Sequence, residues 1–263
     1  MEKLRIYQVD AFTDRLFAGN PAAVCPLDDW LDERTMQDIA AENNLAETAF
    51  LVQQEDVYHI RWFTPTVEVD LCGHATLAAA HVLFNHLGVV KRSVTFHSHR
   101  SGILEVRRSN NMLTMNLPTD DLTELEIHPD FKSALGKSPV RTFLGKTDYM
   151  MVFQSEDEIR TMDPDLMKLR KMPARGVIVT APGDHTDFVS RFFAPQSGVD
   201  EDPVTGSAHT SLTPYWSKEL NKKDLTAVQL SKRTGLIQCR DLGKRTEISG
   251  SAVTYLIGEI NIV

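Results

Sequence analysis

The feature that most constrains the fold of this chain is that it repeats itself. Residues 61–65 read RWFTP and residues 191–195 read RFFAP. Further along, CGHA from Cys72 matches TGSA from Thr205 at an offset of 133, and residues 100–107 match residues 233–240 at the same offset. Matching segments in one order and at a constant offset indicate a duplication. A period this long predicts two duplicated half-domains and not a solenoid.

Each half shows the same coarse order of predicted elements. Alternating and continuous apolar runs predict strands at 4–12, 48–53, 58–63, 94–97, 102–107 and 112–117 of the first half. Helices are expected at 32–43 and from Gly73 to a C-cap at Gly88. The second half repeats this order from about residue 148, with a helix at 207–221 that Pro214 can kink.

These elements predict an α+β fold with two pseudo-symmetric domains, each a curved, mostly antiparallel sheet wrapped around a central helix. The expected domains are residues 1–117 and 118–263, with the last strand able to return to the first domain. The polar segment 118–147, which contains prolines, is expected to cross between the halves.

Composition excludes several classes of function. A net charge of −8 over 263 residues argues against nonspecific binding of nucleic acid. The chain has no run of 18 apolar residues, so no membrane span is expected, and its first residues read as a strand and not as a signal peptide. Cys25, Cys72 and Cys239 lack CxxC spacing, so we expect no disulfide framework or zinc site and a reducing cytoplasm, with Cys25 and Cys239 buried as small apolar side chains.

Two glycine turns are the first candidates for a site. Gly73 and Gly206 each follow a strand and precede a predicted helix, whose first N–H groups lack intrahelical partners and carry the positive end of the helix dipole. Such helix starts bind carboxylates or oxyanions, and two of them facing one cleft would hold a small anionic substrate from both sides. The alternative is that His74 and Ser207 are only caps or solvated side chains beside these turns.

The differences between the halves point to catalytic residues. Glu47 begins an otherwise apolar strand, whereas the equivalent stretch 174–179 has no carboxylate. Glu47 is therefore either a solvated residue at a strand end or a proton carrier whose basicity partial burial raises. In the second half, Glu201-Asp202-Pro203 precedes the glycine turn, and Asp202 is the better placed carboxylate, although Asp-Pro is also a common turn dipeptide.

Cys72 resembles the thiol base of a two-base racemase. Its counterpart in the repeat is Thr205, whose hydroxyl is no general base without activation, so a complete dithiol pair is absent. The aromatic residues Trp62, Phe63, Phe192 and Phe193 fit either a hydrophobic pocket or the core.

Four motifs resemble one known family. GNPAAV at 19–24, ENNLAETAF at 42–50, FTPTVEVDLCGHATLAAA at 63–80 and EDPVTGSAH at 201–209 are similar to the PhzF-like (phenazine biosynthesis-like) family of the diaminopimelate epimerase fold. The resemblance covers nearly the whole chain. It implies no metal, no organic cofactor and, frequently, a homodimer.

The resemblance also implies an activity and roles for residues. The best-known activity of the family is isomerisation of trans-2,3-dihydro-3-hydroxyanthranilate by a proton shift. The residue matching Glu47 shuttles the proton, assisted by residues matching His74, Asp202 and Ser207. The residue matching Asn20 completes the pocket, and the backbone amides at Gly73 and Gly206 hold the carboxylate.

Three hypotheses follow from the sequence. The first is a cofactor-independent isomerase that moves a proton on a small carboxylate-bearing metabolite, with Glu47 as the shuttle and with Cys72 and Thr205 among the binding residues. The second is an amino-acid epimerase or racemase that uses Cys72. The third is a non-catalytic protein that binds a metabolite or another protein in the same cleft.

Overall fold

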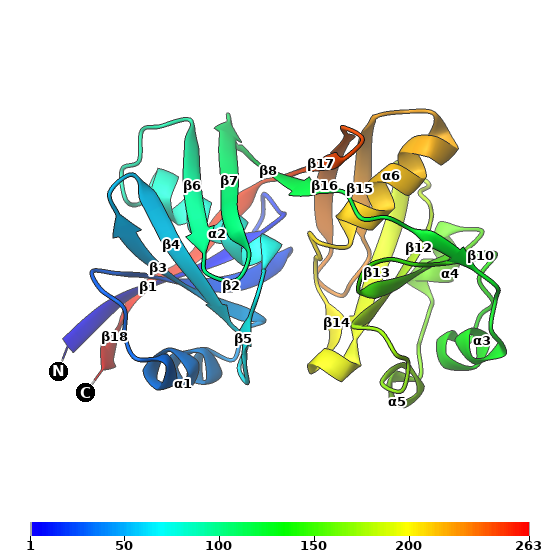
Figure 1. The fold of residues 1–263 in the computed structure, drawn as a ribbon, viewed down its shortest axis with the longest axis horizontal. Helices are drawn as coiled ribbons and strands as arrows, with labels where there is room; N and C mark the ends of the chain where they lie inside the picture. The colour runs from blue at the N-terminus through cyan, green and yellow to red at the C-terminus, as the bar shows by residue number, and fades with distance from the viewer. Residues whose placement is uncertain (1, 263) are drawn as a thin grey trace. The chain divides into compact units, whose positions relative to one another are not determined.

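Two units make up the fold of this chain, for which a computed structural model describes residues 2–262 (Figure 1). The first unit contains the residues up to Asn116 together with those from Ser249 onward, and the second contains Leu117–Ile248. The chain therefore leaves the first unit once and comes back to it for its last strand.

The first unit contains both termini of the described chain. Its elements are β1 (Glu2–Ala11), β2 (Asn20–Leu27), α1 (Glu33–Asn43), β3 (Glu47–Gln54), β4 (Val57–Phe63), β5 (Glu68–Val69), α2 (Gly73–Asn85), β6 (Ser93–Ser98), β7 (Gly102–Ser109), β8 (Met112–Pro118) and β18 (Ala252–Ile262).

The second unit is continuous in sequence. Its elements are β9 (Thr123–Leu125), α3 (Pro129–Leu135), β10 (Arg141–Leu144), β11 (Asp148–Val152), α4 (Glu156–Arg160), α5 (Leu166–Leu169), β12 (Gly176–Pro182), β13 (Phe188–Ala194), the 3₁₀ turn η1 (Pro195–Ser197), β14 (Val199–Asp202), α6 (His209–Leu220), β15 (Asp224–Gln229), β16 (Gly235–Asp241) and β17 (Arg245–Gly250).

The strands of the two units pair in the same order and with the same sense. In the first unit the pairing runs β18–β1–β2–β3–β4–β6–β7, and in the second it runs β9–β10–β11–β12–β13–β15–β16. In both units the third and fifth pairings are parallel and the other four are antiparallel. The predicted duplication and the mostly antiparallel α+β fold are therefore confirmed.

Helix α2 is the buried centre of the first unit. Ten of its thirteen residues are buried, and it packs against β1, β2, β3 and β18. Its sequence ATLAAA combines the residue of highest helix propensity with small side chains that let strands approach closely. A helix that is apolar on nearly every side belongs in a core. The packing around α2 therefore fixes the position of its first turn.

The helix predicted at 207–221 begins later than expected, at His209, and ends at Leu220. Before it, the N–H groups of His209 and Thr210 donate to the carbonyls of Gly206 and Ser207, three residues back. This is the spacing of a 3₁₀ turn, which is tighter than an α-helix. Pro214 lies inside the helix, as expected.

The segment 118–147 does more than connect the halves, because it contains β9, α3 and β10. β9 and β10 pair with each other and belong to the sheet of the second unit. The start of α3 carries two local signals that indicate a helix: Pro129 stands in its first turn and the His128 side chain accepts from the N–H of Asp130. The polar composition of this segment concealed these short elements.

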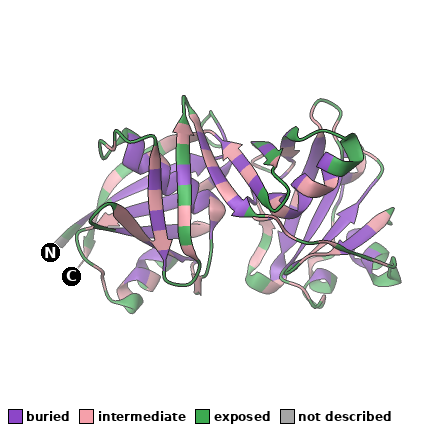
Figure 2. Cartoon of the chain, turned by 45° about the horizontal axis from the view of Figure 1, so that its top comes forward, coloured by how far each residue is buried: buried purple, intermediate pink, exposed green. Residues whose placement is uncertain are grey.

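The four aromatic side chains that fitted either a pocket or a core lie in the cores. Trp62, Phe63, Phe192 and Phe193 are all buried, as are Cys25 and Cys239, and Figure 2 shows buried residues running along the strands of both units. None of the helices formed by residues 2–262 is both long and apolar enough to span a membrane.

The two faces of neighbouring strands β6 and β7 give a test of this fold. Phe96 on β6 is fully buried, whereas Ile103 on β7 is 64% exposed. Phe96→Ala should lower the free energy of unfolding by about 3–5 kcal/mol because it leaves a cavity. Ile103→Ala should change it by no more than about 0.5 kcal/mol. Urea denaturation of both variants measures the difference, and equal losses would contradict the assigned register.

Candidate active site

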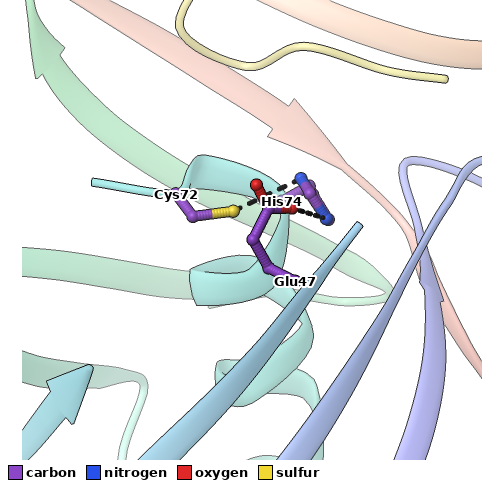
Figure 3. Close-up of side chains that lie close together, drawn as sticks. All are labelled: Glu47, Cys72 and His74. Atoms are coloured by element: carbon purple, nitrogen blue, oxygen red, sulfur yellow. Dashed lines mark hydrogen bonds and ion pairs between the residues drawn. The ribbon is translucent and has the colours of Figure 1, made fainter. Parts of the chain in front are cut away.

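Three element starts meet in the first unit. Asn20 is the first residue of β2, Glu47 is the first residue of β3, and His74 is the second residue of α2. β2 and β3 pair in parallel with Ala22 opposite Glu47, so both strands begin at the same edge of the sheet. The side chains of Glu47, Cys72 and His74 converge there (Figure 3).

Gly19 positions Asn20 at this edge. Its φ of +64° lies in the left-handed region, and a Cβ there would be 2.1 Å from the carbonyl oxygen of Ala11. Only glycine fits such a close approach between backbones. In the antiparallel register Asn20 then stands opposite Ala11, with its side chain turned to His74.

His74 is the centre of this group of side chains. Its Nε2 lies 3.2 Å from Oε2 of Glu47, and its Nδ1 lies 3.1 Å from Nδ2 of Asn20. An amide nitrogen can only donate, so with this amide orientation Nδ1 accepts and the ring proton resides on Nε2, on the side of Glu47.

The imidazole of His74 is neutral in this environment. Burial lowers its pKa to about 3, because the buried ring loses the hydration that would stabilise its charged form. His74 is thus suited to orient or exchange a proton with Glu47 and not to supply a fixed positive charge. The Glu47 side chain keeps 16% of its surface exposed, although its Oε2 is buried.

Cys72 occupies the N-cap position of α2, and its Sγ lies 3.4 Å from Nδ1 of His74. Its side chain makes no capping hydrogen bond to the helix. The start of a helix favours negative charge, either a thiolate or an oxyanion of a ligand. The N–H groups of Gly73 and His74 lie at the N-terminal end of α2, where such an anion is favoured.

The site residues predicted in the second half form a group of their own in the second unit. The hydroxyl of Thr205 donates to Oδ2 of Asp202, and its backbone N–H donates to Oε1 of Gln229 at 2.8 Å. Gln229 Nε2 in turn donates to the carbonyl of Asp202 at 2.7 Å and to Oγ1 of Thr205 at 3.2 Å. Because these bonds use the Thr205 hydroxyl as both donor and acceptor, it is no substitute for a second thiol base.

Ser207 lies in the turn before α6 and is held by an arginine. Arg175 Nη2 donates to Ser207 Oγ at 3.1 Å, and Arg175 Nε donates to Oδ1 of the buried Asp148 at 2.9 Å. Burial opposes the charge of Arg175, but its bond to Asp148 and the nearby charges of Asp202 and Asp120 outweigh burial and raise its pKa. Glu201, by contrast, forms an ion pair with Arg191, as a structural carboxylate would.

The matching strands show how the two halves diverged. Phe63 stands opposite Thr48 in the first unit and Phe193 opposite Val177 in the second, so the position of Glu47 corresponds to Gly176. A Cβ at Gly176 would lie 2.4 Å from the ring of Phe192. In the second unit the Phe192 ring therefore occupies the space that a side chain at Gly176, the equivalent of Glu47, would need.

Two residues in contact with the predicted site were missed from the sequence. Arg175 directly precedes the position equivalent to Glu47, and a charged residue just before an apolar strand was an available signal. Gln229 lies at the end of β15, about 24 residues after Thr205, and only the parallel pairing of β13 with β15 brings it to the turn. No local pattern indicates it.

Among residues 2–262, one group of side chains has the composition of a metal site. The donor atoms of Glu47, Cys72 and His74 all lie within 4.8 Å of one another. The sequence predicted no metal, and the structure provides oxygen, sulfur and nitrogen donors in one place.

The fold is that of known epimerases. A hydroxyproline epimerase from Agrobacterium vitis, solved with bound trans-4-hydroxy-L-proline, aligns with a TM-score of 0.63 over 99% of this chain and 91% of its own, at 10% sequence identity. This likeness shows the fold alone.

Closer relatives define the family. A family model described as phenazine biosynthesis-like protein matches residues 9–258. A phenazine biosynthesis protein of the PhzF family from Enterococcus faecalis has a TM-score of 0.97 and 44% identity, covering 99% of this chain and 100% of its own. A relative named an uncharacterized isomerase from Pseudomonas aeruginosa is 51% identical over 99% of both chains. The chain therefore belongs to the phenazine biosynthesis-like family, which confirms the resemblance seen in its motifs.

The buried imidazole of His74 predicts a dependence of stability on pH. Its folded-state pKa of about 3 is below the unfolded value of about 6.5, so protons favour the unfolded chain and stability falls as the pH drops through this window. The free energy of unfolding therefore falls between pH 8 and pH 5, and His74→Gln should make this fall smaller by about 2 kcal/mol. Chemical denaturation at several pH values measures this, with the exposed His185→Gln as control. An unchanged slope in His74→Gln would contradict the neutral, buried imidazole.

Proposed function

We propose that this protein is a cofactor-independent isomerase in which Glu47 moves a proton on a small carboxylate-bearing metabolite. The observation that carries the proposal is the contact of 3.2 Å between the Glu47 carboxylate and the buried, neutral His74 at the start of α2. A relative 51% identical is named an isomerase, which supports the class of reaction.

In this mechanism Glu47 accepts a proton from one carbon of the substrate and returns it to another. The protonated Nε2 of His74 lies 3.2 Å from Oε2 of this carboxylate, and Asn20 holds the tautomer that places the proton there. The first N–H groups of α2, at Gly73 and His74, stabilise negative charge that develops on the substrate. A proton shift of this kind is redox-neutral and needs no electron carrier.

Asp202, Thr205, Gly206 and Ser207 are proposed to bind the same substrate. Ser207 Oγ accepts from Arg175, so its own hydroxyl hydrogen remains available to a substrate oxygen. That residues of both halves bind one substrate stays a prediction from the sequence.

We also propose the setting in which the enzyme works. The net charge of −8 and the burial of Cys25 and Cys239, whose thiol pKa values burial raises to about 12, support a cytoplasmic protein that does not act on nucleic acid or membranes. A homodimer is proposed from the family resemblance, and sedimentation equilibrium should give twice the chain mass of 29.6 kDa. A mass of one chain at micromolar concentration would contradict it.

A solvent-deuterium exchange screen over small carboxylates tests the proposed chemistry and finds a substrate. The isomerase should incorporate deuterium at one carbon and shift a double bond without inverting a stereocentre. Incorporation together with inversion would indicate an epimerase instead. Tight binding without any exchange would indicate a protein that binds a metabolite but does not turn it over.

Glu47→Gln tests the residue assignment on that substrate. The amide keeps size and hydrogen-bonding reach but cannot take a proton, so kcat should fall by about 10²–10⁴-fold. KM should change little if binding comes mainly from the helix starts. The matched control is Glu105→Gln, which alters an exposed carboxylate on β7 of the same unit. Full turnover by Glu47→Gln would show that another residue moves the proton.

The contact between Cys72 and His74 favours a second candidate, an epimerase with Cys72 as a base. The Cys72 thiol lies 3.4 Å from Nδ1 of His74 and at the N-cap of α2, where the positive end of the helix dipole favours a thiolate. Cys72→Ala should then be more damaging than Glu47→Gln, the reverse of the order expected for the isomerase. Comparing kcat for the two variants decides between the candidates.

A further inference from the structure

The side chains of Glu47 at the start of β3 and of Cys72 and His74 at the start of α2 can also act as ligands for a divalent transition metal. Cys72 offers a thiolate, His74 an imidazole and Glu47 a carboxylate, and their donor atoms lie within 4.8 Å of one another. Sulfur, nitrogen and oxygen donors in one place suit zinc, which accepts three protein ligands and keeps a fourth position open.

The distance between Cys72 and His74 already has the value that zinc requires. With Zn–S of about 2.3 Å and Zn–N of about 2.0–2.1 Å, a tetrahedral site separates sulfur and nitrogen by about 3.5 Å. Sγ of Cys72 and Nδ1 of His74 are 3.4 Å apart. The present contact of Glu47 is with the other ring nitrogen, Nε2, at 3.2 Å, and its donor oxygen lies within 4.8 Å of the other two donor atoms, so its side chain must rotate toward the Nδ1 side to complete the site.

The charges balance as well. A thiolate and a carboxylate together neutralise a divalent cation, and the imidazole adds none, so the metal could enter this largely buried place without leaving a net charge there. Zinc would replace the Asn20 amide as the partner of Nδ1, and water could fill the open position. Asn20 therefore competes with the metal for the same nitrogen.

We propose that Glu47, Cys72 and His74 form a zinc-binding site that, when occupied, blocks the proton shuttle. Binding itself follows from the donor atoms, whereas the inhibition rests on the proposed function, since the metal would hold both Glu47 and His74. Each ion bound displaces the thiol proton of Cys72 to solvent, and no bond to carbon is made or broken.

The imidazoles of His59 and His97 form an alternative place where a metal could bind. His59 and His97 stand opposite each other on parallel strands β4 and β6, with Nδ1 atoms 3.3 Å apart, beside a cavity of about 290 Å³. Two neutral, half-buried imidazoles hold a metal less firmly than three ligands of balanced charge. Any test must therefore separate the two places.

Cobalt(II) provides a readout that does not depend on activity. Protein treated with a chelator and dialysed should bind one Co²⁺ with a thiolate-to-metal charge-transfer absorption, and Zn²⁺ should displace it at one equivalent. Cys72→Ser should abolish this absorption and weaken Zn²⁺ binding by about 10²-fold or more, since even outer partners of metal ligands contribute 10–100-fold. Glu47→Gln, which keeps the thiol, should weaken binding and retain the absorption.

Matched controls keep the outcome decisive. Cys25→Ser and Cys239→Ser change thiols elsewhere in the fold and should leave both signals unchanged, as should His59→Gln. No Co²⁺ absorption at micromolar metal, or its loss in His59→Gln and not in Cys72→Ser, would overturn the proposal. If Zn²⁺ binds through Cys72 but exchange of the substrate proton continues in the zinc-loaded protein, the metal site stands and the role of Glu47 as shuttle fails.

Discussion

The burial of α2 is the constraint on which the candidate site depends. Nearly all of this helix is enclosed by β1, β2, β3 and β18, so it has little freedom to rotate or slide. Its first turn is thereby placed at the edge where β2 and β3 begin, and Asn20, Glu47 and His74 come together from three separate parts of the sequence. The close backbone approach at Gly19 belongs to the same arrangement, because the chain must turn sharply to start β2 there.

The duplicated fold explains how one architecture can carry different chemistry in its two halves. Both units repeat the same strand pairings, so each presents a turn and a helix start at the equivalent place. In the first unit this place holds a carboxylate, a thiol and a neutral imidazole. In the second, Gly176 leaves room for the Phe192 ring, Thr205 is engaged by Asp202 and Gln229, and Ser207 is held by Arg175. The scaffold is conserved between the halves while the polar side chains are not, which is what a single proton carrier requires.

Close packing of Glu47, Cys72 and His74 underlies both roles proposed for them, proton transfer and metal binding. The geometry that keeps His74 neutral beside Glu47 also collects donors that a metal can use. Desolvation disfavours an imidazolium there, and it equally favours a set of ligands whose charges cancel. A residue set of this kind can be a proton relay in one state and a metal ligand in another, and the choice depends on which partner the solution supplies.

The sequence by itself determined the duplication, the α+β class, the family and which residues to examine. These follow from periodicity, the constant offset and four local motifs, all of which are written in the order of the residues. Trp62 and Phe193 could not be assigned to core or pocket in this way, since burial depends on what packs from elsewhere in the chain. The tertiary structure alone decided that His74 stands between Glu47 and Cys72, that Gln229 supports the second turn, and that α6 starts at His209 after a 3₁₀ turn. Each of these results depends on contacts between segments distant in sequence or on competition between hydrogen-bond spacings, and neither leaves a trace in local composition.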